Sequence, residues 1–175
     1  MKAIRIISIS IFTVLLTFCS ADSDKDLYES GMNLITEKKY DEAIEKFDNL
    51  LEKNNKSELA PKALFESAKL YQGQVIKNLS DRQSLLKSVE VYKKIFDNYP
   101  SSEEAENALF MAGFILANEL NDLDSARKNY ELYLERYPQG QLADDARVEL
   151  QNLGKTPEEI LMEKMQKESI DEKAI

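Results

Sequence analysis

The acidic residues are the side chains of this chain whose type and spacing could support chemistry. Neighbouring carboxylates can bind a divalent cation or act as a general acid and base. None of the clusters here has the spacing of a calcium-binding loop or of a catalytic carboxylate pair. Acids also stabilise the first turn of a helix through its dipole. We therefore predict helix starts, rather than metal or catalytic sites, at residues 22–26, 103–104, 144–145 and 158–159.

The residue types that most enzymes use for nucleophilic catalysis are scarce. The chain has no histidine, and its single cysteine is Cys19. Ser-His-Asp and Cys-His catalysis, a Cys/His zinc site and a disulfide framework are therefore excluded. The sequence also lacks a glycine-rich phosphate loop and a nucleophile motif. We expect a protein that is not an enzyme and needs neither a cofactor nor a metal.

Composition and charge narrow the class of protein further. With 43% hydrophobic and 31% charged residues among 175, the chain can bury a core. Only five glycines and four prolines occur, which favours helices over a fold with many turns. The net charge of −9 opposes binding to nucleic acid, because such binding requires a cationic face.

Residues 1–21 have the features of an export signal. Lys2 and Arg5 precede an apolar stretch at residues 6–18, which is shorter than the ~20 residues that a membrane span needs. The following Leu-Thr-Phe-Cys at residues 16–19 resembles a bacterial lipobox. That resemblance implies a lipid anchor on Cys19, with cleavage before it. Cleavage after Ala21, giving a plain secreted protein, and an uncleaved anchor are the alternatives.

One helical pattern occurs twice in the body of the chain, 38 residues apart. Residues 91–100 read VYKKIFDNYP, and residues 129–138 read NYELYLERYP. In each copy apolar side chains fall at i, i+3, i+4 and i+7, which is one face of an α-helix. The closing proline ends each helix. A helix repeated at a fixed offset predicts stacked repeats rather than one globular core.

Similar periodicity predicts helices along the rest of the chain. We expect a tether at residues 21–26, an extension of the third helix through residues 71–78, and a capping box from Ser101 to Glu104. Gly154 should end the seventh helix, and a second capping box at Thr156 should start the helix-prone tail. The expected helices span residues 27–36, 40–53, 63–71, 81–99, 105–116, 125–137, 141–153 and 158–174.

Small and aromatic residues recur at matching positions of these helices. The first helices carry Gly31, Ala68 and Gly113, where a small side chain lets a neighbouring helix backbone approach closely. The second helices carry a small residue and then an aromatic residue four positions later, at Ala43/Phe47, Ser88/Tyr92 and Ala126/Tyr130. Together with the closing Pro100 and Pro138, this pattern resembles the tetratricopeptide repeat.

The resemblance implies an all-α fold of antiparallel helix pairs stacked as a right-handed solenoid. About three repeats and a capping helix at residues 141–153 are expected. The implied domains are the signal peptide at 1–21, the repeat domain at 22–154 and a C-terminal helical tail at 155–175.

The same resemblance implies protein–protein interaction through the concave face, which the first helix of each unit lines. Aromatic residues flanked by lysines would suit an extended or helical partner segment with acidic residues. Packing against adjacent helices is the alternative role for these side chains. The positions implied to face a partner are Lys25, Tyr28, Met32, Lys62, Phe65, Lys69, Asn107, Phe110 and Phe114.

A lipobox-like start followed by repeats that close on Tyr-Pro resembles bacterial envelope repeat proteins. The BamD-type outer-membrane assembly lipoproteins and the C-terminal repeat domain of the CpoB (YbgF) type are the nearest kinds. This resemblance implies an exported, periplasmic scaffold, anchored to the outer membrane through Cys19 and serving outer-membrane protein assembly. A Tol-Pal-type accessory role is the alternative. From other classes, a lipoprotein that self-associates through its C-terminal helix, or an unrecognised envelope enzyme, stays open.

Overall fold

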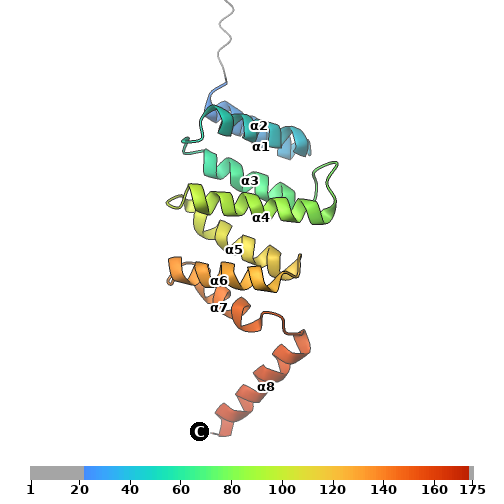
Figure 1. Cartoon of the computed structure of the whole chain (residues 1–175), viewed down its shortest axis with the longest axis vertical. Helices are drawn as coiled ribbons and strands as arrows, with labels where there is room; N and C mark the ends of the chain where they lie inside the picture. Colours follow the sequence, from blue (N-terminus) through green and yellow to red (C-terminus); the bar gives the residue numbers. More distant parts are fainter. Residues whose placement is uncertain (1–21, 174–175) are drawn as a thin grey trace, which may run out of the picture.

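The computed structural model describes residues 22–173, so the expected signal segment, including Cys19, lies outside the described residues. Within this range the chain forms eight α-helices and no strand. Figure 1 shows the helices stacked along one axis, with the last one leaving the stack. Their bounds are α1 Asp24–Thr36, α2 Tyr40–Lys53, α3 Ala60–Gln72, α4 Asp81–Asn98, α5 Glu103–Asn118, α6 Leu123–Arg136, α7 Ala143–Asn152 and α8 Pro157–Lys173.

The helices pair in the order predicted for a repeat protein. Helices α1, α3 and α5 each pack against the helix that follows them, and α2, α4 and α6 pack against the first helix of the next unit. Helix α7 begins a fourth unit and caps the stack. The expected all-α fold of stacked helix pairs, about three units and a capping helix, is confirmed. Within residues 22–173, none of the helices combines the length and apolar composition that crossing a membrane requires.

The small residue of each first helix makes room for the second helix of the same unit. A Cβ added to Gly31 would lie 2.4 Å from Cε1 of Phe47, and one added to Gly113 would lie 3.1 Å from Cε1 of Tyr130. At Ala68, the Ser88 hydroxyl donates to the backbone oxygen at 2.8 Å. An aromatic ring or a hydroxyl therefore occupies the space, whereas the sequence analysis expected a neighbouring backbone.

Helix α1 starts earlier than expected, so the predicted tether at residues 21–26 is wrong from Asp24 onward. Ser23 caps the helix: its hydroxyl accepts from the Asp26 backbone N–H at 3.1 Å, and its own N–H donates to the Asp26 carboxylate at 2.9 Å. This reciprocal pair satisfies two backbone donors that would otherwise be free. The short acidic run is therefore a capped helix start.

Helix α3 ends at Gln72, and its predicted extension through residues 71–78 is wrong. The backbone of Gln74 and Asn78 has φ of 56° and 63°, the left-handed region that a continuing α-helix does not use. Ser80 then caps α4, with its hydroxyl accepting from the Gln83 N–H and the Gln83 side chain accepting from the Ser80 N–H. The second unit thus owes its length to a longer loop and to the extra first turn of α4 before Ser88.

The capping box predicted from Ser101 to Glu104 is also wrong. Ser102 holds the N-cap position of α5, and its side chain makes no capping bond. The Ser102 hydroxyl oxygen is buried without a hydrogen-bond partner, while the Ser102 backbone N–H donates to the Tyr99 backbone oxygen at 2.9 Å.

The capping box predicted at Thr156 is present. Its two hydrogen bonds to Glu159 measure 2.7 and 3.2 Å.

We predict that Gly31→Ala destabilises the fold by about 1–3 kcal/mol, because the added methyl group overpacks the fully buried Phe47 ring. This cost exceeds the gain of about 0.5–1 kcal/mol that alanine brings to a helix. Denaturant unfolding followed by circular dichroism measures the difference. Gly73→Ala is the control, since the nearest atom to its Cβ is 3.4 Å away and its φ is −69°. Equal stability of the two variants would contradict the packing argument.

Candidate functional site

The acidic residues at helix starts are engaged in structural bonds. The Ser23 hydroxyl and backbone N–H lower the pKa of Asp26, and the Ser125 side chain and N–H lower the pKa of Asp122. The Asn54 amide donates to Asp24 at 2.7 Å and lowers its pKa. These carboxylates are held in the ionised form by capping and by bonds between helices, as their interpretation as helix starts predicts.

The described residues contain no group of three or more acids, histidines and cysteines placed to hold a metal ion. Asp48 on α2 is the acid to compare with a catalytic residue, because burial raises the pKa of its carboxyl. However, Asp48 as a whole residue is exposed to solvent. The positive charges of Lys94 and Lys87 also lower the pKa of its carboxyl and so oppose the effect of burial. A general acid is normally held in a water-excluded pocket, which this position does not provide.

The residues expected to face a partner divide into three groups by exposure. We call the surface that carries these nine residues the first-helix face. Tyr28, Met32, Phe65 and Phe114 are half-buried, and Phe110 is buried at 8% exposure. The four polar members are exposed and lie on α1, α3 and α5: Lys25, Lys62, Lys69 and Asn107.

Two of the half-buried aromatic rings rest on an aromatic ring of the second helix. The Tyr28 ring lies 5.9 Å from the Phe47 ring, and the Phe65 ring meets Tyr92 edge-on at 5.3 Å. Such pairs add to helix packing beyond the area they bury. Because Tyr28 and Phe65 also keep part of their surface in solvent, each both holds its unit together and presents an apolar edge.

Phe110 does not share this arrangement, and its predicted place on an accessible face is wrong. Its ring lies 5.7 Å from Tyr130 and 5.9 Å from Tyr133, inside the core of the third unit. Burial raises the pKa of the Tyr133 hydroxyl, which donates to Glu106 and accepts from the Leu142 N–H at 3.0 Å. Phe110 therefore belongs to the cluster that joins α5, α6 and the turn before α7.

The first-helix face carries charges of both signs. Lys69 pairs with Glu66 at 2.8 Å, and Lys25 lies 3.5 Å from Glu29. Lys62 is exposed and makes no ion pair with another described residue. Burial raises the pKa of the Tyr28 hydroxyl.

Nearby carboxylates act on that same hydroxyl. Glu66 of α3 and Glu104 of α5 raise the pKa of Tyr28 further, after the effect of burial. Carboxylates of α3 and α5 therefore act electrostatically on a side chain of α1 on this face.

Val148 on α7 is an exposed apolar residue that the sequence analysis missed. It is 54% exposed and lies 38 residues after Phe110, the offset that relates the two Tyr-Pro copies. Applying that offset beyond Ala143 and Ala146 would have found it. It is uncovered because, within residues 22–173, no second helix packs over α7 in the way that α6 packs over α5.

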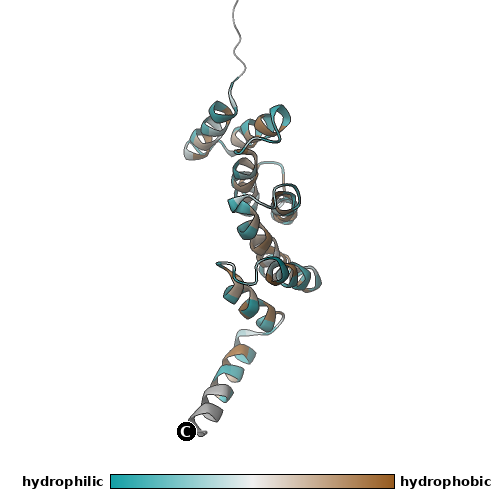
Figure 2. Ribbon diagram, turned by 90° about the vertical axis from the view of Figure 1, so that its left-hand side faces the viewer, coloured by the Kyte–Doolittle hydropathy of each residue, from teal (hydrophilic) through white to brown (hydrophobic). Residues whose placement is uncertain are grey.

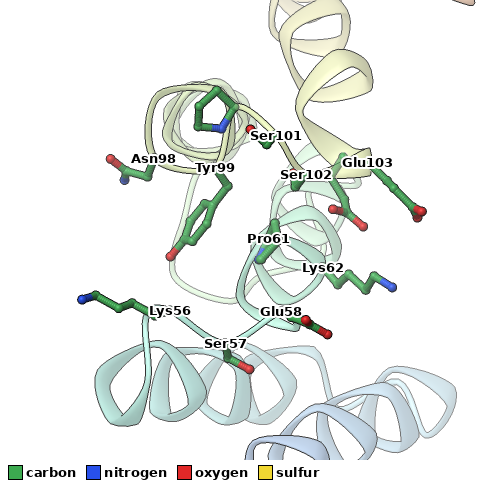
Figure 3. A pocket seen from close by; sticks show the side chains of 12 residues that line it. Lys56, Ser57, Glu58, Pro61, Lys62, Asn98, Tyr99, Ser101, Ser102 and Glu103 are labelled. Carbon is green, nitrogen blue, oxygen red and sulfur yellow. The ribbon is translucent and has the colours of Figure 1, made fainter.

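A hollow of about 550 Å³ lies between the turn joining α2 to α3 and the turn joining α4 to α5. Figure 3 shows the Tyr99 ring between these turns, with Lys56 and Ser57 on one side and Ser101 on the other. The Tyr99 hydroxyl donates to the Asn55 backbone oxygen at 2.8 Å. Sequence reasoning placed Tyr99 on the α4 face, whereas it lies just after α4 and links two units.

We expect Tyr99→Phe to cost about 0.5–1.5 kcal/mol of unfolding free energy, since one hydrogen bond between units is lost. Tyr137→Phe is the matched control, because Tyr137 occupies the same position in the second Tyr-Pro copy and its hydroxyl makes no hydrogen bond among the described residues. Urea unfolding of both variants tests this expectation. A Tyr137 variant that loses as much stability as the Tyr99 variant would show that the bond does not matter.

Comparison with known proteins gives one family match. The tetratricopeptide repeat family model matches residues 107–140, which cover most of α5, all of α6 and the Tyr-Pro turn after it. A search of the curated proteins finds no match to the chain. The family match and the stacked helix pairs support a protein of the tetratricopeptide repeat type, and such repeats generally mediate the binding of protein partners.

Proposed function

We propose that this chain is a non-catalytic protein-binding scaffold of the bacterial cell envelope. Its partner segment would lie along the first-helix face. The observation that carries the proposal is the row of half-buried apolar side chains on α1, α3 and α5, each with one edge in solvent: Tyr28, Met32, Phe65 and Phe114. Partly exposed aromatic anchors on a rigid support are typical of binding hot spots.

Charge on the first-helix face favours a partner segment that carries both apolar and acidic residues. Lys62 is the exposed cation without an ion pair, and its neighbour along the face, Lys69, keeps 52% of its side chain exposed while paired with Glu66. An acid of the partner can reach Lys62 without breaking an existing ion pair. Because Lys62 lies on α3, we place the acidic part of the partner near α3.

Location in the envelope rests on the sequence of residues 1–21. The basic start, the short apolar stretch and the lipobox-like residues 16–19 support export and lipidation of Cys19. The mature protein would then be anchored at the periplasmic side of the outer membrane. The likeness to BamD-type lipoproteins supports a role in outer-membrane protein assembly, and the likeness to the CpoB type supports a Tol-Pal-type accessory role instead.

A photocrosslinking experiment tests the binding face. We expect a photoreactive phenylalanine analogue at position 32 or 114 to crosslink a defined envelope protein in living cells. Leu86 on the second helix α4 is the control position, because it is 48% exposed and lies away from the first helices. Lys62→Glu should reduce crosslinking at both positions, since the acidic partner is repelled. Crosslinking of the same protein at position 86 alone would place the partner on the second helices and contradict the proposed binding face.

Metabolic labelling with an alkyne palmitate analogue tests the anchor. Wild type should take up the label and sediment with membranes, whereas Cys19→Ser should take up none, because the cysteine thiol is the site of lipidation. An exported but unlabelled wild-type protein would remove the lipoprotein proposal. The binding face would stay untouched by that result, since it lies on residues 25–114.

A further inference from the structure

The last repeat unit of the solenoid is incomplete. Helices α1, α3 and α5 are each covered by a second helix that runs antiparallel to them. Helix α7 packs against α6, but α8 leaves the stack instead of folding back over it (Figure 1). The side of α7 that a second helix would cover therefore carries the exposed Val148.

Two residues of α8 explain why it does not complete the unit. Second helices α2 and α6 place a fully buried alanine four residues after the N-cap and a fully buried aromatic residue eight residues after it, whereas α4 places Ser88 and Tyr92 eight and twelve residues after its N-cap. Counted from its cap at Thr156, α8 has Ile160 and Lys164 in the first spacing and Lys164 and Glu168 in the second, so neither spacing supplies the pair. The larger isoleucine blocks close approach, and a lysine cannot be buried without a partner.

The linker between α7 and α8 also holds α8 away. Gly154 has a φ of +83°, which ends α7 and redirects the chain. The Lys155 ammonium pairs with Glu163 at 2.6 Å and braces the first turns of α8. In each chain, α8 is thus held in a direction that leaves α7 of the same chain uncovered.

Helix α8 itself presents a short apolar strip to solvent. Met165 lies four residues after Leu161 and three residues after Met162, so these side chains fall on one side of the helix. Figure 2 shows this apolar start of α8 standing clear of the stacked helices. The strip consists of Leu161, Met162 and Met165, which are 57%, 68% and 60% exposed.

We infer that α8 of a second copy of this chain packs antiparallel on α7, in a reciprocal dimer. Apolar residues and charges match in that direction. On α7, Asp145 lies three residues before Val148, and on α8, Lys164 lies three residues after Leu161. With Val148 against Leu161, an antiparallel arrangement brings Asp145 to Lys164, and both are exposed without an ion pair among the described residues.

A second copy fits this position better than the chain's own α8. The linker of the same chain, with Gly154 and the Lys155–Glu163 pair, directs its α8 away from α7, whereas the α8 of another copy is not tied to that linker. Exchange of α8 between two copies covers both α7 helices at once, with two identical contacts related by a two-fold axis. Each contact repeats the antiparallel pairing of the three complete units.

Sedimentation of the full chain in a mild detergent tests the dimer. Wild type should show a reversible monomer–dimer equilibrium, and Leu161→Glu should raise the dimer dissociation constant about 10-fold or more. Leu86→Glu is the matched control: it replaces an apolar residue of similar exposure, 48%, on α4 and should leave the equilibrium unchanged. Circular dichroism should show equal helicity for all three proteins.

Charge reversal distinguishes this contact from any other route to a dimer. Asp145→Lys and Lys164→Asp should each weaken association, because like charges then face each other in both contacts. An equimolar mixture of the two variants should restore dimers, since every contact then joins opposite charges. Wild type that stays monomeric at all concentrations would leave the α7 face to another occupant and overturn the inference. Failure of the mixture to associate better than either variant alone would overturn it as well.

Discussion

The contact between a small residue of each first helix and the second-helix side chain that packs on it is the interaction on which the solenoid depends. Phe47 lies so close to Gly31 that even one methyl group has no room there, and Tyr130 packs similarly on Gly113. The middle unit reaches the same closeness differently, through the Ser88 hydroxyl bonded to the Ala68 oxygen. Because each unit is tightened locally, stability in such a protein is approximately a sum of units and their interfaces.

This contact also decides which side chains remain for a partner. The second-helix aromatics Phe47 and Tyr130 are fully buried in it, so they have no surface to offer. First-helix residues such as Tyr28, which rests on Phe47, lie at the edge of the same contact and keep part of their surface in solvent. The candidate binding face is therefore a by-product of repeat packing, and a partner would meet side chains already held rigid, which reduces the entropy lost on binding.

The end of the stack shows what happens when that contact is not made. Ile160 and Lys164 stand where α2 and α6 have an alanine and an aromatic residue, so α8 has nothing to place against α7. Val148 is left exposed as a result. A repeat protein must cover its terminal unit to stay soluble, and residues from a second chain can do so.

The helices, their pairing and the number of units could be predicted from the sequence, because apolar periodicity, the 38-residue offset and the Tyr-Pro stops are local signals. The sequence also identified most of the half-buried residues of the first-helix face. The burial of Phe110, the end of α3 at Gln72 and the exposure of Val148 became known only from the packing of the folded chain. Each of these depends on which neighbouring helix or loop arrives at that position, and periodicity along one helix carries no information about its neighbour.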